Sequence, residues 1–520
     1  MTQIHQTDKR TGIEYVYESE SYWDKEKKQS RYKPRKLIGH IDKKTGEIVP
    51  NRPMRTSPKD PLARRLFCGA DYLLEQVSEQ IGLSKDLKDA FPGIDKALLS
   101  IAHYFVCEDS SAAARFERWS RTHAHPFAAP IASQRLSELF EHVGQTGAEA
   151  LFALRVARSS GAYWFYDTTS ISSYSQLIES VRWGRNKDKV ALPQINVAAV
   201  LDAKTGQPVW FKDLAGNITD VVLVRELLAE AKRYGAKRMR LCFDRGFYSK
   251  TNIDALLGEH MKFLVGLKCS LVFVRGAIKE NAHALRDWKN YDNETHTWGM
   301  RMDHPWDFER RHPRKATTET GTRRTYLYLY FSAERALREE DEFSQFLSIL
   351  INELNRGNYQ DEHTKLYERY FKRVRGGKYV GRDDAIQAER DTFGYFALLS
   401  NDASLNPREA LGVYRDKDRI EKAFGDIKDR LDFRTPRVEN AETLRGKLLC
   451  VFVGLILATE LRGRMHKADL YKKHTMVSLI DELETIERYE SLGHLPRILS
   501  VTEKQKELFE SLGVKPLTAS

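Results

Sequence analysis

Features that mark secreted, membrane or nucleotide-binding proteins are scarce in this sequence of 520 residues. It has only five cysteines, scattered without a CxxC pair. This argues against a disulfide framework or a structural zinc site and for a reducing compartment. The first ten residues contain no apolar stretch of the kind found in a signal peptide. The sequence also lacks a Walker-type glycine loop, so we expect no nucleotide cofactor.

Long hydrophobic runs are also missing. The longest apolar run, residues 448–458, is about half of the ~20 residues that a membrane-spanning helix needs. We interpret this run as a buried core helix. Together with the missing signal peptide, it predicts a cytoplasmic protein without a membrane partner.

Charge of one sign is in excess. The chain has 84 Lys and Arg residues against 73 Asp and Glu residues, which gives a formal net charge of +11. Hydrophobic residues make up 41 % and charged residues 30 %, which excludes a wholly disordered chain, a collagen and a polytopic membrane protein. The surplus favours a polyanionic partner, most simply nucleic acid. A basic enzyme without such a partner fits the charge alone about equally well.

Two histidines, His123 and His125, lie two residues apart and are a possible start of a metal site. A metal site needs further ligands, and none lies nearby in the sequence. We therefore interpret this segment as a surface turn.

The hydrophobic period changes along the chain and divides it into five regions. They are a basic, β-rich N-terminal segment (1–60), a helical candidate DNA-binding region (61–158), an α/β core in two pieces (159–270 and 396–465), an inserted, mostly-β domain (271–395) and a helical C-terminal region (466–520).

The first piece of the core contains a recognisable order of elements. The pattern predicts strands at 161–167, 194–202 and 208–212, a helix at 217–235, and then strand, helix and strand up to residue 267. Three strands followed by helix, strand, helix and strand is typical of a mixed α/β sheet, and it is the order of the ribonuclease H-like fold. We therefore expect a ribonuclease H-like mixed-sheet core with an inserted domain.

Two aspartates end predicted neighbouring strands of this core. Asp167 follows the first strand, and Asp244 follows the strand that begins near residue 238. Each alone is compatible with a cap of the following turn. Together, at the carboxyl ends of strands in one sheet, they predict a shared site for a divalent metal ion.

A third carboxylate lies on a charge-rich segment that we predict to be one helix over residues 414–428. Ile420, Phe424 and Ile427 form its apolar stripe. An adjacent face displays Glu421 between basic groups, an arrangement suited to a metal ion beside a phosphate chain. A solvated helix with ordinary surface ion pairs is the alternative for this segment taken alone.

These residues resemble a known family. About 160–270 and 395–450 are similar to the DDE transposases of bacterial insertion sequences, specifically the insertion-sequence-four-like group. The signature of that group is Tyr, two residues, Arg, three residues, Glu, six residues and Lys. Tyr414, Lys417, Glu421 and Lys428 stand at these intervals, with Lys417 in the place of the family's Arg. A lysine offers a point charge rather than the planar fork of an arginine.

The resemblance implies roles for the site residues. Asp167, Asp244 and Glu421 are then the catalytic residues and the ligands of two Mg²⁺ ions, with Mn²⁺ as a substitute. The resemblance also implies that the neighbouring aromatic and basic side chains contact DNA: Tyr414, Arg415, Lys417, Arg419 and Lys428.

The family also implies the reaction and the partners. The enzyme would bind the terminal repeats of its element, cleave a phosphodiester by hydrolysis and join the exposed 3′ end to target DNA. The partner is double-stranded DNA, the active form is a homodimer on that DNA, and the protein is associated with the nucleoid. A metal-dependent structure-specific nuclease or resolvase on the same fold and a catalytically idle DNA-binding descendant of a transposase are the alternatives.

Overall fold

The computed structural model describes the chain apart from short gaps. These gaps are residues 1, 9–11, 20, 25–28, 33–35, 43–47, 51–62, 109–111, 185–186, 188–189, 219, 312–317, 432, 492–493 and 519–520. The chain divides into two compact units, one of residues 1–64 with 489–496 and one of residues 65–488 with 497–520. The region boundary that we predict at residues 60 and 61 lies outside the described residues.

The first unit consists of strands. A four-stranded sheet has the order β1 (Thr2–Thr7), β2 (Glu14–Ser19), β5 (Lys36–Ile41) and β6 (Ile48–Pro50), with every neighbouring pair antiparallel. Strands β3 (Ser21–Asp24) and β4 (Gln29–Tyr32) form a separate antiparallel pair. Three further short strands lie wholly or partly in the second unit: β7 (Ala63–Phe67), β19 (Glu487–Ser491) and β20 (Arg497–Ile498).

The centre of the second unit is a nine-stranded mixed sheet with the order β10-β9-β8-β11-β12-β18-β15-β14-β13. Its strands are β8 (Tyr163–Ser172), β9 (Gln194–Asp202), β10 (Pro208–Ala215), β11 (Arg240–Phe243), β12 (Lys262–Leu267), β13 (Tyr291–Asp292), β14 (Thr297–Arg311), β15 (Thr318–Phe331) and β18 (Tyr395–Ser400). Strands β8, β11 and β12 are parallel, whereas β9 and β10 run antiparallel to their neighbours. The expectation of a mixed α/β protein is therefore confirmed.

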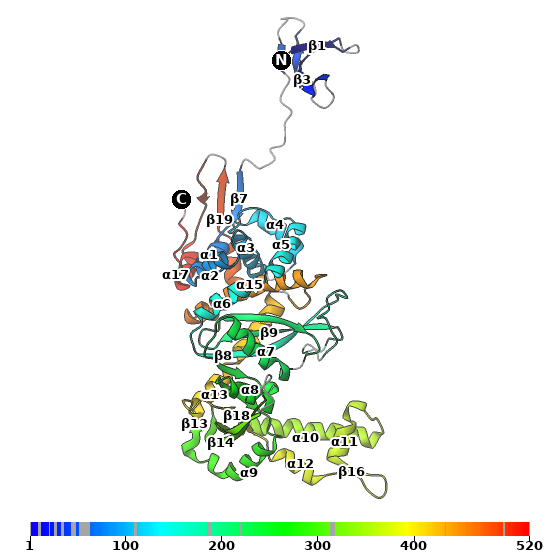
Figure 1. The fold of residues 1–520 in the computed structure, drawn as a ribbon, viewed down its shortest axis with the longest axis vertical. Helices are drawn as coiled ribbons and strands as arrows, with labels where there is room; N and C mark the ends of the chain where they lie inside the picture. The colour runs from blue at the N-terminus through cyan, green and yellow to red at the C-terminus, as the bar shows by residue number, and fades with distance from the viewer. Residues whose placement is uncertain are drawn as a thin grey trace. The chain divides into compact units, whose positions relative to one another are not determined.

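Helices surround this sheet (Figure 1). Before the sheet in the chain come α1 (Gly69–Gln80), α2 (Leu83–Ala90), α3 (Asp95–Cys107), α4 (Ala113–Thr122), α5 (Ser133–Thr146) and α6 (Glu149–Arg158). Between strands lie α7 (Asp220–Arg233), α8 (Lys250–Gly258) and α9 (Val272–Leu285). After the sheet come α13 (Pro407–Arg415), α14 (Asp418–Gly425), α15 (Ala441–Lys467), α16 (Met476–Glu484) and α17 (Glu503–Ser511). Within the described ranges, no helix combines the length and the apolar character that a membrane crossing needs.

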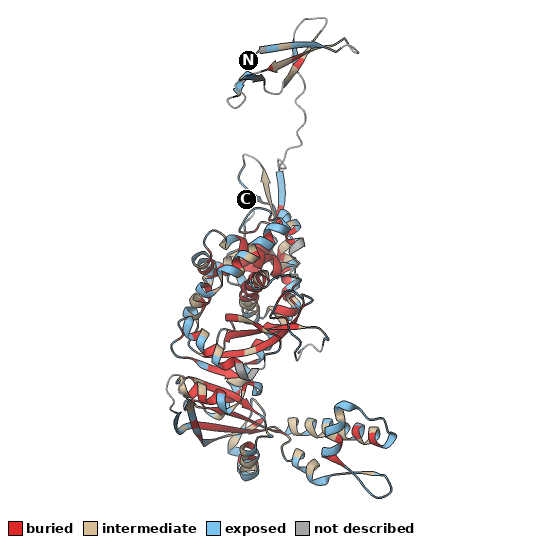
Figure 2. Cartoon of the chain, turned by 45° about the vertical axis from the view of Figure 1, so that its right-hand side comes forward, coloured by how far each residue is buried: buried red, intermediate tan, exposed pale blue. Residues whose placement is uncertain are grey.

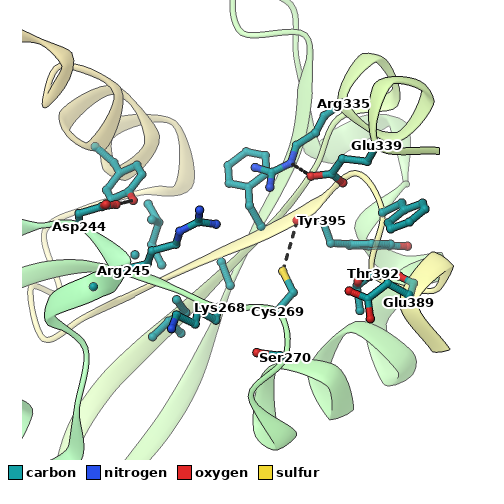
Figure 3. Close-up of a pocket in the computed structure, with 18 of the residues that line it drawn as sticks. Asp244, Arg245, Lys268, Cys269, Ser270, Arg335, Glu339, Glu389, Thr392 and Tyr395 are labelled. Atoms are coloured by element: carbon teal, nitrogen blue, oxygen red, sulfur yellow. Dashed lines mark hydrogen bonds and ion pairs between the residues drawn. The ribbon is translucent and has the colours of Figure 1, made fainter. Parts of the chain in front are cut away.

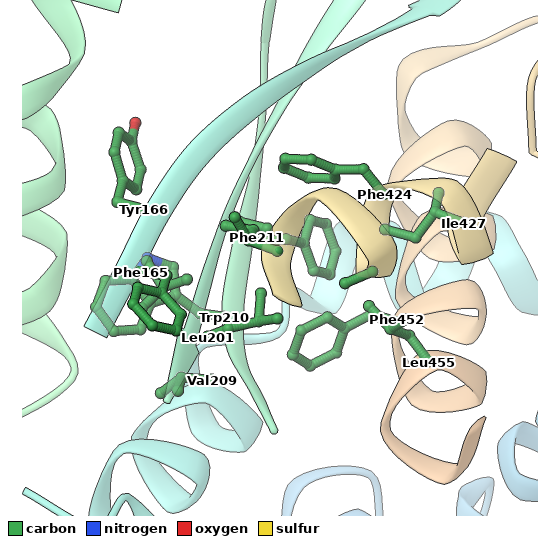
Figure 4. Close-up of a cluster of buried hydrophobic side chains, with 14 of the residues drawn as sticks. Phe165, Tyr166, Leu201, Val209, Trp210, Phe211, Phe424, Ile427, Phe452 and Leu455 are labelled. Carbon is green, nitrogen blue, oxygen red and sulfur yellow. The ribbon is translucent and has the colours of Figure 1, made fainter. Parts of the chain in front are cut away.

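One continuous apolar core joins the sheet to the helices of both ends of this unit. The apolar run 448–458 lies inside α15 and is buried, as predicted. Phe452 on α15 packs on Phe211 of β10, with ring centroids 5.2 Å apart. Phe424 and Ile427 face the same cluster from α14 and the turn after it (Figure 4). This cluster anchors the segment that carries Glu421 to the sheet.

The inserted region differs from the expectation. We predict residues 271–395 to be mostly β, but they contain α9, the long helix α10 (Ala333–Arg356), α11 (Thr364–Tyr370) and α12 (Asp383–Arg390). Strands β14 and β15 do not form a separate domain, because β15 pairs with β18 and thereby extends the central sheet.

Helices α10–α12 have a small core of their own. It comprises Leu350, Leu354, Tyr367, Tyr370 and Phe371. With the hairpin of β16 (Phe371–Arg373) and β17 (Tyr379–Gly381), these helices form a lobe beside the sheet, which carries much less buried surface than the sheet itself (Figure 2).

Helices α5 and α15 approach closely through glycines. A Cβ atom on Gly446 would lie 1.8 Å from the carbonyl oxygen of Phe140, and one on Gly144 would lie 1.9 Å from that of Glu442. Gly446→Ala therefore forces two backbones apart and should lower the free energy of unfolding by about 1–3 kcal/mol. Gly463→Ala on the same helix is the control, because no described atom lies within 4 Å of its Cβ. It should stabilise the protein by about 0.5–1 kcal/mol.

Denaturant unfolding of both variants tests this prediction. Equal stability of Gly446→Ala and the wild type would mean that the two helices do not pack at this distance.

Candidate active site

The first two carboxylates meet because their strands are parallel neighbours. Tyr166 of β8 stands opposite Phe243 of β11, so the next residues, Asp167 and Asp244, lie side by side. Asp167 also pairs with Ala199 of β9 on the other side. The sheet register therefore brings together two residues that are far apart in the sequence.

The strand that carries Asp167 is longer than predicted. We expect it to end at Asp167, but β8 continues to Ser172, so the aspartate lies in the middle of a strand. The residues that follow, Thr168 to Ser172, include threonines and an isoleucine, which favour strand conformation, and they pair with β9. Asp167 still lies next to Asp244 because β8 and β11 are parallel neighbours. Asp244 follows the last residue of β11, whereas β8 continues beyond Asp167.

The third carboxylate lies on a helix that is shorter than predicted. The expected helix 414–428 is broken at residues 416–417 into α13 and α14, and a π-helical turn, Asp426–Arg430, follows. The break puts Tyr414 and Glu421 on different helices. The predicted apolar residues Ile420, Phe424 and Ile427 are buried, so α14 still turns its apolar side toward the sheet.

All three carboxylates line one pocket of about 450 Å³. Four basic or acidic side chains share its wall: Lys187, Lys428, Asp429 and Arg434. Gly246 and Phe247, from the turn after β11, complete the side near Asp244. Carboxylates from two strands and a helix thus face one solvent-accessible volume together with basic groups.

Lys417 connects two of the carboxylates. Its Nζ lies 2.9 Å from Glu421 Oε1 and 3.9 Å from Asp167 Oδ2, and its side chain is only 7 % exposed. Burial alone would lower the pKa of Lys417, but the charge of Asp167 and the hydrogen bond to Glu421 raise the pKa above its ordinary value. The side chain is therefore an ammonium ion inside an acidic pocket.

The two aspartates differ in proton affinity. Burial raises the pKa of Asp167, and the nearby charges of Lys187 and Lys417 offset only part of this effect. Burial also disfavours the charged form of Asp244. There, however, the charge of Lys417 and hydrogen bonds from the Arg245 amide and Tyr414 lower the pKa below its ordinary value. Of the two aspartates, Asp167 therefore holds a proton more tightly.

Tyr414 contacts a carboxylate in this structure. Its hydroxyl donates a hydrogen bond to Asp244 Oδ1 at 2.9 Å, and burial raises the pKa of this phenol, so it remains a donor. The two arginines beside Lys417 are not among the residues that line the pocket. Arg415 is exposed, and Arg419 donates to the carbonyl oxygen of Ala203 at 2.8 Å. The DNA contacts that the resemblance implies for these residues stay predictions.

Sequence reasoning missed Lys187. It lies in the loop between β8 and β9, where its Nζ is 3.6 Å from Asp167 Oδ1 and also donates to the Thr168 hydroxyl at 3.2 Å. Its backbone amide donates to the Ser170 hydroxyl at 2.7 Å. No spacing in the sequence links this lysine to the carboxylates, because only the pairing of β8 with β9 returns the loop to the site.

A larger hollow of about 1380 Å³ adjoins the pocket and shares Asp244, Lys187 and Thr168 with it. It extends from the ends of β11 and β12 to the helical lobe (Figure 3). Its wall carries basic side chains from several elements: Arg245, Lys268, Arg275 and Arg335. Glu339 pairs with Arg335 at 2.7 Å on the side of the lobe. A hollow lined by both basic and acidic side chains therefore adjoins the carboxylates.

Carboxylates that converge from adjacent strands are typical of metal-dependent phosphoryl-transfer centres. In agreement with this class, residues 164–457 match the family model of the transposase DDE domain. This match covers more than half of the chain, and the chain belongs to that family of transposases. DDE transposases generally use divalent metal ions.

Other comparisons add less. Among solved structures, the piggyBac transposase in a synaptic complex with hairpin DNA is similar to this chain with a TM-score of 0.34 and 11 % sequence identity. The similarity covers 80 % of this chain and 76 % of that chain. The comparison with curated proteins gives no match.

Proposed function

We propose that Asp167, Asp244 and Glu421 are the catalytic carboxylates of a DNA transposase. The observation that carries this proposal is their convergence on one pocket within the matched transposase domain. The strand order β10-β9-β8-β11-β12, in which only β9 runs opposite to the other four strands, supports a ribonuclease H-like core. The signature intervals support membership of the insertion-sequence-four-like group, with Lys417 as a departure.

The donor set fits hard divalent ions. Three carboxylates offer only oxygen ligands, which suit Mg²⁺ and Mn²⁺. The electrostatics also fit a cation, because Lys187 and Lys417 offset only part of the effect of burial on the Asp167 carboxylate. When bound, the ions would activate the attacking oxygen and stabilise the leaving one.

The remaining residues would orient the carboxylates and hold DNA. Tyr414 fixes one oxygen of Asp244 and thereby sets the direction of the other. Lys187, Lys417 and Lys428 place positive charge around the pocket, where the scissile phosphate would lie. The hollow that adjoins the pocket would take the rest of the strand. The helices of the predicted DNA-binding region, residues 61–158, are candidates for contacts with the terminal repeats. The site would act on double-stranded DNA in a homodimer.

Cleavage of the flanking DNA tests this proposal. The two DNA ends that flank the gene are cloned around a marker and incubated with the purified protein, with EDTA or with added Mg²⁺ or Mn²⁺. We expect cleavage at the ends only with a metal ion, and joining of a pre-cut 3′ end to a second DNA. Cleavage without joining would favour a structure-specific nuclease. Binding without cleavage would favour an idle descendant.

Lys428 offers a separate prediction about the DNA contact. Its side chain is buried and lines the pocket, so Lys428→Gln should weaken binding to an end and reduce the slope of log affinity against log salt by about 1. Fluorescence anisotropy at several salt concentrations measures both. Lys473→Gln is the control, because this exposed lysine does not line the pocket. An unchanged slope in Lys428→Gln would remove Lys428 from the phosphate contacts.

A further inference from the structure

His123 is not on a surface turn, contrary to the expectation from the sequence. It follows α4, its side chain is 7 % exposed, and its ring stacks on Trp119 with centroids 4.4 Å apart. Its Nδ1 donates to the carbonyl oxygen of Trp119 at 2.9 Å. A carbonyl can only accept, so in the neutral ring the proton is on Nδ1 and Nε2 presents a lone pair. This arrangement is typical of histidines that bind metals. Burial lowers the pKa of His123, but the nearby carboxylates of Glu484 and Asp71 raise it above its ordinary value, and a metal ion at Nε2 would take the place of the second proton.

Two carboxylates face this lone pair. Glu484, the last residue of α16, has Oε1 3.6 Å from His123 Nε2. Glu108 caps the end of α3. One ligand atom from each of these three residues lies within 4.8 Å of the other two. The three residues come from the ends of the consecutive helices α3 and α4 and of the distant helix α16.

One carboxylate oxygen in this cluster and one beside it lack hydrogen-bond donors. Among the described residues, Glu484 Oε1 and Asp71 Oδ2 are shielded from solvent and have no hydrogen-bond partner. Asp71 is 2 % exposed, and its other oxygen is 3.0 Å from His103 Nδ1. A buried oxygen without a donor costs free energy unless a cation or water satisfies it.

The charges near the cluster also favour a cation. Burial raises the pKa of Asp71, and the charge of Glu484 adds to this effect. The pKa of Glu108 is raised in the same way, by burial and then by Glu484. The charge of His123 is the largest opposing effect on both carboxylates, followed by Arg488 on Asp71 and by Arg115 and Arg118 on Glu108. These cations only partly offset the effect of burial on the two pKa values.

We propose that Glu108, His123 and Glu484 bind one transition-metal ion of the Zn²⁺ type. An imidazole nitrogen with two carboxylates suits Zn²⁺ rather than Mg²⁺, which prefers oxygen ligands only. Tetrahedral bonds of about 2.0–2.1 Å place ligand atoms about 3.4 Å apart, close to the 3.6 Å between His123 and Glu484. The ion would tie the ends of α3, α4 and α16 together. The proposal does not depend on the function of the catalytic pocket.

Metal content in a variant with a disabled catalytic pocket tests this proposal. The full-length Asp167→Asn/Asp244→Asn protein is stripped with EDTA, titrated with Zn²⁺ by calorimetry and assayed for bound metal. We expect one tightly bound equivalent and a rise in the thermal midpoint on binding. Co²⁺ should give the visible absorption of a tetrahedral site.

Removal of single ligands then locates the ion. In the same background, the Glu108→Gln and Glu484→Gln variants should each bind no Zn²⁺ tightly, and Zn²⁺ should not raise their thermal midpoint. Glu138→Gln, on the surface of α5, should still bind one equivalent and show the rise. Glu108 is exposed, so its variant is expected to fold, and circular dichroism verifies this. The proposal would be wrong if the parent protein bound no equivalent of Zn²⁺. It would also be wrong if the folded Glu108→Gln and Glu484→Gln proteins still bound one equivalent, and His123 and Glu484 would then form an ordinary ion pair.

Discussion

Asp244→Asn is expected to reduce DNA cleavage by about 10³-fold or more while the affinity for DNA stays nearly unchanged. The substitution keeps the size of the side chain and an acceptor for the Tyr414 hydroxyl, but it removes a charge that faces the pocket. In the proposed site Asp244 is a metal ligand, and loss of such a ligand removes several kcal/mol of transition-state stabilisation; about 4 kcal/mol corresponds to 10³-fold.

Single-turnover cleavage of labelled DNA ends, with binding measured in parallel, tests this expectation. Glu226→Gln is the matched control, because that carboxylate lies on the surface of α7 and pairs with Lys212. Asp167→Asn and Glu421→Gln should behave like Asp244→Asn. Metal-dependent nicking at the wild-type rate by any of the three folded variants would remove that residue from the catalytic set.

Lys417→Met should have the second-largest effect, because it removes a buried positive charge between carboxylates. The Lys417 ammonium lowers the pKa of both Asp167 and Asp244. Without it, both carboxylates hold protons more tightly, so the acid limb of the cleavage profile should move to higher pH. Removal of the ammonium also removes its repulsion of a metal ion. The Mg²⁺ concentration at half-maximal activity should therefore fall.

Cleavage by Lys417→Met should also fall, on the order of 10-fold or more, because a charge beside the scissile phosphate is lost. Lys417→Arg keeps the charge and restores the residue of the family signature, so it should retain the pH profile. A Lys417→Met protein with an unchanged pH profile and an unchanged Mg²⁺ requirement would contradict the geometry of the pocket. Lys422→Met is the control, because this exposed lysine pairs with Asp418 on α14.

Much of the sheet could be predicted from the sequence. Strands β9 and β12 have the predicted limits because mostly apolar, β-favouring residues lie between turn residues. The proximity of Asp167 and Asp244 follows from the same strand pattern, since parallel neighbours place equivalent residues side by side.

Other features depend on contacts that no local pattern reveals. Helix α10 is rich in charged residues and packs mainly within its own lobe, so its apolar stripe is weak against the surrounding polar sequence. The break between α13 and α14 gives no clear signal, because residues 414–428 have a continuous helical period. Lys187 comes to Asp167 only through the pairing of β8 with β9. Glu108 and Glu484, the two carboxylates near His123, lie at the ends of other helices.

Strand transfer tests the central claim most directly. A short duplex that carries the element end with a pre-cut 3′-OH is mixed with target plasmid, Mg²⁺ and either the wild-type protein or one of the Asp167→Asn, Asp244→Asn and Glu421→Gln variants. We predict covalent joining by the wild type alone, and none without Mg²⁺. Joining by all four proteins at equal rates would mean that the chemistry takes place elsewhere in the chain.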